Sequence, residues 1–578
     1  QQFSVTIAVS VVISAFNALT LSPALCALLL RRREPPKKGF FAAFNRWFAR
    51  RMDKYTAFTP TLIRHVARTG VFIAAVLAVI FLVWRKLPAG FLPEEDQGYV
   101  MVMVSTPEAS SLQVTQKAMI RADEVIRTLP EVASTSFAAG FNMMAGIAST
   151  DSGIIFVSLV GYSDRKLTAM EIAQKLTDEL YMAVPGAECF AFIPPSIPGL
   201  GITSGVSVEV QDLEGRGTAY LLEQSERLMD SLRKLPSVAS VTTQFNAGVP
   251  QRRLRIDKEQ ALASGVDLGV LYGDLTTLLG GAYVNNFSRF GKLYQTYIQA
   301  APAYRMDKRS LDSYYVASSS GESVPVSSLV EVVDTVGVEY VSQFNLYRSI
   351  GLTVTPAART STTTVMQDIT RTAAQVLPDD VGTAWSGTSF QEANASKTGG
   401  LVYLLALVFV FLALAALYES WGLPLAILMS VPVAVLGAVL FIGVSHLLNA
   451  FYVNDIYMQI SLVMLIGLAA KNAILVVEYA DRLFNEQGAS LMDAAIGAAK
   501  LRVRPIIMTA FAFILGVMPL IFASGVYATA RNIMGVALVG GMLFATLLGI
   551  FVYPALYYFV GRIGGFERRR ERKKQEQS

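Results

Sequence analysis

Cysteine, histidine and charged residues are scarce in this 578-residue chain, and each scarcity excludes a class of protein. Cys26 lies in an apolar run and Cys189 in a distant polar region, so we expect no disulfide, and neither residue has metal-site spacing. The two histidines, His65 and His446, are far apart in the sequence. Without a nucleophile–base pair, a phosphate loop or a metal-ligand motif, the sequence predicts no enzyme, no cofactor and no metal site.

The low charge content predicts an integral membrane protein. Charged residues make up 16% of the chain and hydrophobic residues 53%, whereas soluble proteins carry about 25% charged residues. The formal net charge is +5, but the basic residues gather beside apolar runs instead of forming a phosphate-binding surface. No nucleic-acid partner is expected.

Apolar runs of about 20 residues indicate membrane-spanning helices, because a helix satisfies its own backbone hydrogen bonds in lipid. Seven runs qualify, at 4–30, 70–88, 400–418, 422–447, 457–478, 505–524 and 533–560. The first run is too long for a signal-peptide core and has no basic residue before it. Since the chain also begins with Gln1, we expect it to be a fragment whose N-terminal part is missing.

The distribution of basic residues predicts the topology. The loop 31–69 holds eleven Lys or Arg residues and two acidic ones, and the tail 563–578 is also basic. Six predicted spans separate them, so both lie on the cytoplasmic side, and the long polar region 89–397 lies opposite. Within the loop, "GFFAAFNRWFARRM" (39–52) places aromatic residues on one helical face beside arginines, which predicts a helix lying on the membrane surface.

The polar region contains an internal repeat. The segment "VIRTLPEVASTS" (125–136) recurs as "SLRKLPSVASVT" (231–242), with weaker copies at 180–192 and 373–385. Each copy ends a helical pattern with a Pro-containing turn before a strand, and apolar strand-like runs precede the helices. Four strand–helix–strand units predict two α+β subdomains of the split βαβ, ferredoxin-like type.

An insert of about 100 residues interrupts the second subdomain. Its segment "LGGAYVNNFSRFGKLYQ" (279–295) predicts an extended hairpin, and a surface insert of this size predicts a docking element. The fold class is therefore a polytopic α-helical membrane protein with two α+β subdomains and a docking insert. The expected boundaries are 1–30 (span), 31–69 (cytoplasmic loop with surface helix), 70–88 (span), 89–200 (first subdomain), 201–245 plus 346–395 (second subdomain), 246–345 (docking insert), 396–562 (five spans) and 563–578 (cytoplasmic tail).

A lysine, Lys471, interrupts one apolar run within "IGLAAKNAILVVEY" (466–479). A charge at the centre of a span costs roughly 2.5 to 3.5 kcal/mol, so it persists only with a partner or a function. No Asp or Glu lies at comparable depth in another run. Glu478 lies two turns further along the same helix, about 10 Å away, which is too far for contact.

The polar neighbours expected near Lys471 are uncharged or lie at the membrane interface. They are Asn472 beside it and Thr509 in the next run, with Arg502 where that run begins. Two interpretations remain open. Lys471 extends its flexible stem to the interface, or it belongs to a proton relay whose carboxylates lie on helices outside this chain.

Four long segments closely resemble the resistance-nodulation-division (RND) exporters of Gram-negative bacteria, in the hydrophobe/amphiphile branch of AcrB-type multidrug pumps. They are "SVVISAFNALTLSPALCALLL" (10–30), "LALAALYESWGLPLAILMSVPVAVLGA" (412–438), "GLAAKNAILVVEYA" (467–480) and "LRVRPIIMTAFAFILGVMPL" (501–520). The resemblance covers essentially the whole chain, as the second half of such a pump plus the last span of its first half.

The resemblance implies a homotrimer in the inner membrane with a periplasmic porter. It also implies proton-driven export of amphiphilic small molecules, with a periplasmic membrane-fusion adaptor and an outer-membrane channel as partners of the docking insert. In such pumps two aspartates on the fourth span pair with a lysine that aligns with Lys471, and Arg502 and Thr509 align with the rest of the proton path. Those aspartates would lie in the missing N-terminal half.

The resemblance also implies a substrate pocket lined by aromatic residues and a glycine-rich switch loop, matched by 136–156. The chain departs from the pattern at Met143, where phenylalanine is usual, and at Ala139, where valine is usual. Fewer rings and more flexible thioethers would shift substrate preference. The implied pocket residues are Phe137, Ala139, Phe141, Met143, Phe156, Phe190, Phe192, Met101 and Met103, with Gly140 and Gly146 in the switch loop.

Three alternatives remain. The metal-ion (Cu/Ag-type) branch of the same superfamily binds soft cations through methionines, and the chain has suitable residues in Met101, Met103, Met143 and Met144. A scaffold for protein secretion or lipid handling would share the topology but would lack the docking insert. A truncated fragment with no function of its own is the third.

Overall fold

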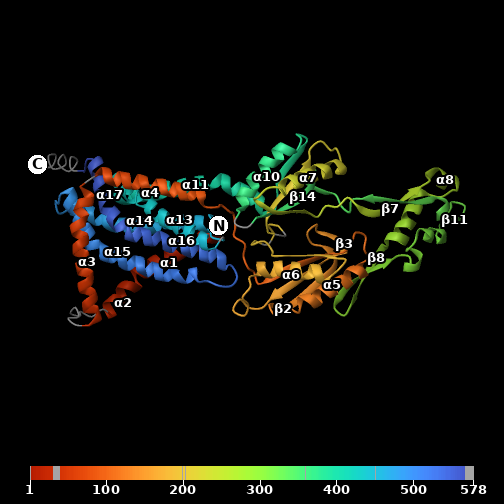
Figure 1. Ribbon diagram of the computed structural model, residues 1–578, viewed down its shortest axis with the longest axis horizontal. Coiled ribbons are helices and arrows are strands. Elements are labelled where there is room, and N and C mark those ends of the chain that lie inside the picture. Colours follow the sequence, from red (N-terminus) through yellow and green to blue (C-terminus); the bar gives the residue numbers. More distant parts are fainter. Residues whose placement is uncertain are drawn as a thin grey trace.

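The computed structural model describes residues 2–29, 39–64, 66–197, 199–201, 204–357, 360–449 and 451–566. The basic runs predicted to be cytoplasmic lie partly outside the described residues, at 31–38 and 567–578. The molecule is elongated, with the apolar helices at one end, two α+β units in the middle and the insert at the far end (Figure 1). The predicted fold class is confirmed.

The apolar end of the molecule is a bundle of helices. Among the described residues, six helical segments are long and apolar enough to cross a membrane. The predicted run at 400–418 lies in α11, whose apolar part, Tyr403–Tyr418, is shorter. The helices of this end are α1 (Gln2–Leu19), α2 (Leu21–Leu29), α3 (Phe40–Ile63), α4 (Val66–Lys86), α11 (Gly387–Tyr418), α12 (Gly422–Leu428), α13 (Val431–Leu448), α14 (Ile456–Asn485), α15 (Leu491–Ile521), α16 (Ala528–Leu547) and α17 (Gly549–Ile563).

The run predicted as one span over 533–560 is divided at Leu548 into α16 and α17, although Leu548 keeps a helical backbone conformation and the hydrogen bonding continues across it. Pro554 lies inside α17 and cannot donate a hydrogen bond to the carbonyl of Ile550, four residues earlier. The hydroxyl of Tyr55 on α3 donates to that carbonyl at 2.9 Å, and its ring makes an edge contact with Phe551. A residue almost 500 positions away therefore satisfies the carbonyl that the proline leaves free.

Helix α3 runs across the end of the bundle, as expected for a helix at the membrane surface (Figure 1). Its inner face is apolar: Ile63 is buried, and Met52 packs against the core formed by α14, α15 and α17. Phe44 and Trp47 remain exposed on another face. One face thus anchors the helix to the protein, and the exposed rings suit the interface between water and hydrocarbon.

Helices α13 and α16 touch through their backbones. A Cβ on Gly437 of α13 would overlap the carbonyl oxygen of Gly540 on α16 and the side chain of Phe544. A Cβ on Gly540 would lie 2.9 Å from the carbonyl oxygen of Gly437. Small residues permit this close approach, which favours helix association in lipid through dispersion contacts.

The first α+β unit is a four-stranded antiparallel sheet covered on one face by two helices. The strand order is β2-β3-β1-β4. On β1, Val100, Val102 and Val104 point into the core between the sheet and the helices, so the alternating pattern buries every second residue there. The elements are β1 (Tyr99–Ser105), α5 (Leu112–Ile126), β2 (Val132–Asn142), β3 (Ile147–Leu159), α6 (Ala169–Ala183) and β4 (Glu188–Phe192).

The second unit repeats this arrangement. β6 and β5 flank β14, and β15 lies beyond β5, so equivalent strands occupy equivalent places in the two sheets. Its helix-side core contains Val206, Val208 and Val210. The elements are β5 (Val206–Asp212), α7 (Thr218–Leu232), β6 (Val238–Thr243), β13 (Ser342–Phe344), β14 (Tyr347–Pro356), α10 (Thr362–Val376) and β15 (Val381–Trp385).

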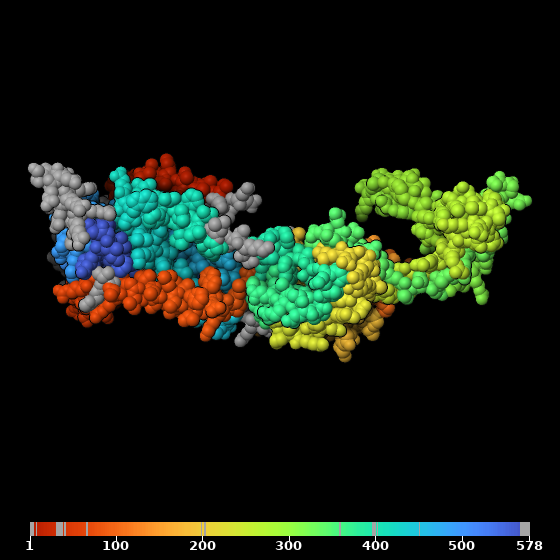
Figure 2. Space-filling view, turned by 90° about the horizontal axis from the view of Figure 1, so that it is seen from above, coloured from red at the N-terminus to blue at the C-terminus, as the bar shows by residue number. Residues whose placement is uncertain are grey.

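The insert enters between β6 and β14 through a two-stranded ribbon, β7 (Val249–Ile256) with β12 (Val330–Gly337). It projects beyond the two units on a narrow neck (Figure 2). Its core packs α8 (Lys258–Ala263) and α9 (Leu268–Leu275) beside the pair β10 (Tyr315–Ala317) and β11 (Ser323–Pro325). The predicted hairpin is present as β8 (Ala282–Arg289) and β9 (Lys292–Ile298), and nearly all of its side chains are exposed.

Candidate functional site

Lys471 lies on an exposed stripe of α14. Val463 and Gly467 precede it at intervals of four residues, and Glu478 follows, all exposed in this chain. Asn472 points the other way and is only 2% exposed. Among the described residues, no carboxylate lies within ion-pair distance of Lys471. The lysine is therefore an unpaired cation on an otherwise mostly apolar helix face.

Arg502 and Thr509 both lie on α15, which packs beside α14. The guanidinium carbon of Arg502 is 4.7 Å from the ring centre of Tyr479. Tyr479 is eight residues beyond Lys471, about 12 Å along the helix. Thr509 is exposed, and its hydroxyl donates to the carbonyl of Ile506 at 3.1 Å. Lys471, Arg502 and Thr509 thus occupy neighbouring helices, with Arg502 well displaced from Lys471 toward the end of α14.

Helix α15 exposes large apolar side chains along most of its length. Met508 is 63% exposed, Phe511 54% and Leu515 63%. Exposed apolar surface of this size in a helical bundle is covered by lipid or by further protein. The uncovered face of α14 together with α15 is therefore able to receive additional helices.

The aromatic and methionine residues predicted around the substrate pocket divide between the two faces of the first sheet. Met101 is paired with Phe156 on β3 and with Phe192 on β4, while Met103 is paired with Ile154 and Phe190. Residues paired across strands share a face, so these six side chains lie on the face opposite the two helices. The rings of Phe190 and Phe192 are stacked at 5.8 Å.

Phe137 and Ala139 are placed differently. The register pairs Phe137 with Ile155 and Ala139 with Gly153, which puts both on the other face of the pleat. Ala139 packs against the helix-side core, whereas Phe137, on an edge strand, is 38% exposed. The structure thus does not bring Phe137 and Ala139 together with Phe156 on one face.

The predicted switch loop joins β2 to β3. Gly140 and Gly146 both have positive φ, +88° and +71°, a backbone conformation that favours glycine. An irregularity in the strand pairing falls between Ala139 and Phe141, so the alternation of side chains changes there. Beyond it, Phe141 is 40% exposed, while Met143 packs against the Met101 cluster.

A cleft of about 460 Å³ separates the switch loop from the second sheet. Met144 and Ala145 form one wall, and residues of β5, β6 and β14, such as Glu209 and Thr353, form the other. The volume lies within the range of about 300 to 1,000 Å³ that is usual for small-molecule sites. Tyr340 also lines the cleft, and burial, together with the negative charges of Glu339 and Glu209, raises its pKa to about 12.

The sequence reasoning missed a polar junction between the membrane helices and the first unit. Glu95 lies in the link from α4 to β1 and is 2% exposed. Its carboxylate accepts hydrogen bonds from the N–H groups of Thr529, at 3.2 Å, and Ala530, at 2.7 Å, in the first turn of α16. A negative charge there is favoured by the helix dipole. Burial nevertheless raises the pKa of the Glu95 carboxyl.

The next residue, Asp96, holds the other side of this junction. Its carboxylate accepts from Arg165 at 2.7 Å and from the N–H of Ala169, where α6 begins, at 2.8 Å. Burial alone would raise the pKa of Asp96, but these donors and the N–H of Gly98 hold it below its usual value. Two adjacent carboxylates thus tie one membrane helix and one helix of the first unit to the same link.

The junction also includes the start of α14. The link from α4 exchanges backbone hydrogen bonds with Asn454, and Asp455 caps α14 by accepting from the N–H of Met458 at 2.8 Å. Asp455 is completely buried, and burial raises its pKa to about 7, with a contribution from the charge of Glu95. In the sequence, this junction is marked only by the acidic residues Glu95 and Asp96, which follow two prolines in the link from α4 to β1.

Comparison with known proteins decides the family. The profile of the AcrB/AcrD/AcrF family matches residues 1–561. The chain belongs to the AcrB/AcrD/AcrF family. The predicted membership among RND exporters is therefore confirmed, and it places the chain in the bacterial inner membrane with its α+β units on the periplasmic side.

Three relatives illustrate the match. The toluene efflux pump membrane transporter TtgB of Pseudomonas putida is 36% identical over 576 residues, 98% of this chain and 54% of the relative. The multidrug resistance protein MdtF of Escherichia coli (strain K12) is 34% identical over 574 residues, 97% of this chain and 54% of the relative. The multidrug export protein AcrF of the same Escherichia coli strain is 33% identical over 571 residues, with the same coverage. The chain spans about half the length of the curated relatives it matches.

Proposed function

We propose that this chain forms part of a secondary transporter that uses the proton-motive force to export amphiphilic small molecules from the periplasm and the inner membrane. The observation that carries the proposal is Lys471, a cation with no carboxylate partner in the part of the chain that the structure describes, on an exposed helix face of a family member. The names of the relatives, a toluene efflux pump and two multidrug proteins, support the same class of substrate.

The proton step takes place where Lys471 meets carboxylates supplied by an N-terminal half. A carboxylate beside an ammonium is held in its charged form, and protonation weakens the pair. On α15, Thr509 supplies an exposed hydroxyl to this step. Asn472 is buried on another side of α14, and Arg502 lies beside Tyr479, nearer the end of that helix, so we propose supporting roles for these two residues. Loading and unloading of the proton changes the packing of α14 against its neighbours, and this change is the energy-coupling step.

The junction around Glu95 and Asp96 carries this change to the periplasmic units. Glu95 is bound to α16 and Asp96 to α6, so a shift of the membrane helices moves the link and the first unit together. The cleft between the switch loop and the second sheet admits the substrate, and the group around Phe156, Phe190 and Met101 binds its apolar parts. Such a site selects by apolar area and adaptable packing.

The proposed assembly is a homotrimer within a tripartite system. The α+β units act as porter subdomains, and the insert docks with a periplasmic membrane-fusion adaptor and an outer-membrane channel. The supporting feature is the projecting hairpin β8–β9, whose exposed aromatic rings include the stacked pair Phe287 and Tyr294 at 5.4 Å. Aromatic side chains on an exposed surface are typical of protein interfaces.

The test is Lys471→Ala in the transporter that contains this chain, scored by accumulation of a fluorescent drug in cells. We expect drug export to be lost while the amount of protein in the membrane is unchanged. Lys471→Arg, which keeps the positive charge, tests whether charge alone suffices, and Lys500→Ala at an exposed site is the matched control. Full export by the Lys471→Ala protein would refute the relay.

A second function has one observation in its favour. Met101 and Met103 pack in one cluster with Met143 and Met144, and thioethers bind soft cations such as Cu(I). If metal export is the function, replacing Met101 and Met103 with leucine lowers copper or silver tolerance and leaves drug export intact. If drug export is the function, tolerance to these metals does not change.

A further inference from the structure

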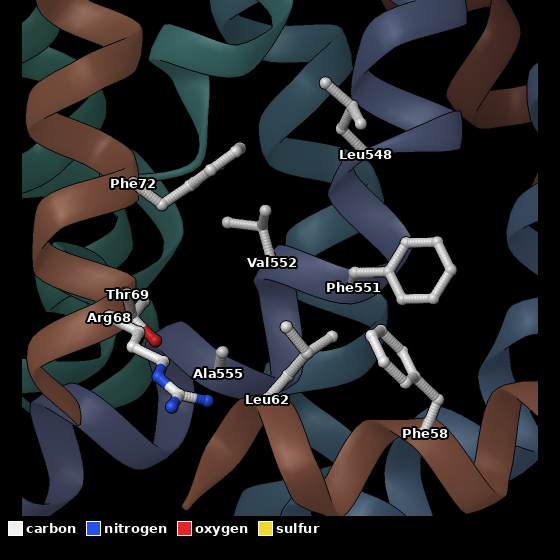
Figure 3. Close-up of a pocket in the computed structure, with 9 residues that line it drawn as sticks. All are labelled: Phe58, Leu62, Arg68, Thr69, Phe72, Leu548, Phe551, Val552 and Ala555. Atoms are coloured by element: carbon white, nitrogen blue, oxygen red, sulfur yellow. The ribbon is translucent and has the colours of Figure 1, made fainter. Parts of the chain in front are cut away.

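A pocket at the cytoplasmic membrane surface has no role in the transport mechanism proposed above. It has a volume of about 260 Å³ and lies between α3, α4 and α17. Figure 3 shows aromatic and aliphatic side chains from all three helices around it, with the guanidinium of Arg68 at one edge. The lining residues are Phe58, Leu62, Arg68, Thr69, Phe72, Leu548, Phe551, Val552 and Ala555.

The pocket combines an apolar interior with a cation at a definite depth. Arg68 lies in the first turn of α4, at the start of the apolar span Ala67–Lys86 and directly after the surface helix α3. An arginine at the end of a span is typical of the membrane interface, where lipid phosphates lie. Phe58 is 53% exposed and Phe72 36%, so the pocket opens on a face of the bundle that the described residues leave uncovered. Val552 and Ala555 form its buried floor.

Arg68 has no carboxylate partner within ion-pair distance among the described residues. Arg64, at the end of α3, adds a second exposed cation nearby in the sequence. A cation at the rim of an apolar pocket, with a second cation four residues earlier in the sequence, matches the chemistry of an anionic lipid, with its phosphate outside and a hydrocarbon chain inside. An apolar protein helix carries no phosphate, so a helix in this pocket would not need the cation at the rim.

We propose that this pocket binds a phospholipid of net negative charge, with the phosphate on Arg68 and part of one acyl chain between Phe72 and Phe551. The lipid thereby fills the space between the surface helix and the two spans. Lipid binding here is independent of the transport mechanism, because it depends only on the shape and charge of the pocket between α3, α4 and α17.

The test is native mass spectrometry of the purified transporter in detergent, with phosphatidylglycerol or phosphatidylcholine added as the probe. Phosphatidylglycerol is expected to remain bound more tightly than phosphatidylcholine. Arg68→Gln should lower the affinity for phosphatidylglycerol about fivefold, since one basic side chain at the surface contributes about that much. Arg85→Gln removes a charge from the opposite end of the same helix and should have no effect.

A second variant tests the apolar part independently of charge. Leu62→Trp at the rim puts an indole ring into the pocket and should displace both lipids, with an unchanged elution volume in size-exclusion chromatography as the check on folding. Equal binding by all variants would overturn the proposal, and so would equal affinity for the two lipids. A co-purifying hydrophobic peptide that the Leu62→Trp variant releases, without any bound lipid, would also overturn it and would assign the pocket to a protein partner.

Discussion

Replacing Asp455 with asparagine is expected to stabilise the protein at alkaline pH. The Asp455 carboxylate caps α14 through Met458, but its second oxygen is buried without a hydrogen bond from any described residue. Burial raises the pKa of this group from 3.8 to about 7, and the nearby charge of Glu95 adds to the shift. Asparagine caps helices about as well as aspartate and carries no charge.

The magnitude follows from the shift in pKa. A change of about three units corresponds to about 4 kcal/mol, at about 1.4 kcal/mol per unit. Because the pKa is raised in the folded state, the folded protein binds the extra proton between pH of about 4 and about 7. This group therefore lowers the free energy of unfolding as the pH rises through that range, and the full penalty is present above it. Relaxation around the charge makes the observed gain smaller, on the order of 2 kcal/mol.

The assay is thermal unfolding of the detergent-purified protein, followed by intrinsic fluorescence at pH 8 and at pH 5. Asp455→Asn should raise the midpoint at pH 8, and the gain should largely disappear at pH 5. Asp257→Asn is the matched control, because Asp257 also caps a helix but is exposed. A midpoint lowered equally at both values of pH would mean that the carboxylate makes favourable contacts, and the reasoning from burial would be wrong.

Two further predictions concern packing and a buried ion pair. Gly437→Ala should separate α13 from α16, because its Cβ overlaps the carbonyl of Gly540, and the thermal midpoint should fall by an amount equivalent to about 1 to 3 kcal/mol. Arg165→Met should destabilise the first α+β unit by about 3 to 5 kcal/mol, because Asp96 loses its cation while the Arg165 side chain is only 2% exposed. Since the pKa of Asp96 is lowered in the folded state, this deficit should shrink as the pH falls below about 4, which limited proteolysis of the unit at several values of pH can measure. An unchanged midpoint for Gly437→Ala, or a deficit independent of pH for Arg165→Met, would contradict these accounts.

The sequence predicted the order of helices, strands and membrane spans well, because each kind of element has its own pattern of apolar residues. The repeat ending in a Pro-containing turn located the four helix–strand segments, and all four are present. Alternation along β1 separates Val100 and Val102, on the helix side, from Met101 and Met103, on the other. Hydropathy located the membrane helices, since a continuous run of about 20 apolar residues has the length needed to span the hydrocarbon core.

The features that the sequence did not predict depend on distant contacts. The break between α16 and α17 falls within an unbroken apolar run, so hydropathy has no signal for it. The resemblance implies that Phe137 and Phe156 line one pocket, but the faces on which they lie depend on the register between β2 and β3. From the sequence, Glu95 is expected to be a solvated acidic residue in a link. Its hydrogen bond to the start of α16 depends on how that distant helix packs.

The hydrogen bond from Tyr55 to the carbonyl of Ile550 gives the surface helix a fixed mechanical attachment. Phe44 and Trp47 are exposed on α3, and such rings suit the headgroup region, so we expect lateral pressure or thinning of the bilayer to act first on this helix. A helix held only by apolar contacts could slide under such a load. Here a displacement of α3 reaches α17 at the carbonyl that Pro554 leaves without a backbone donor. The surface helix is thus coupled to the turn of α17 that has one backbone hydrogen bond fewer.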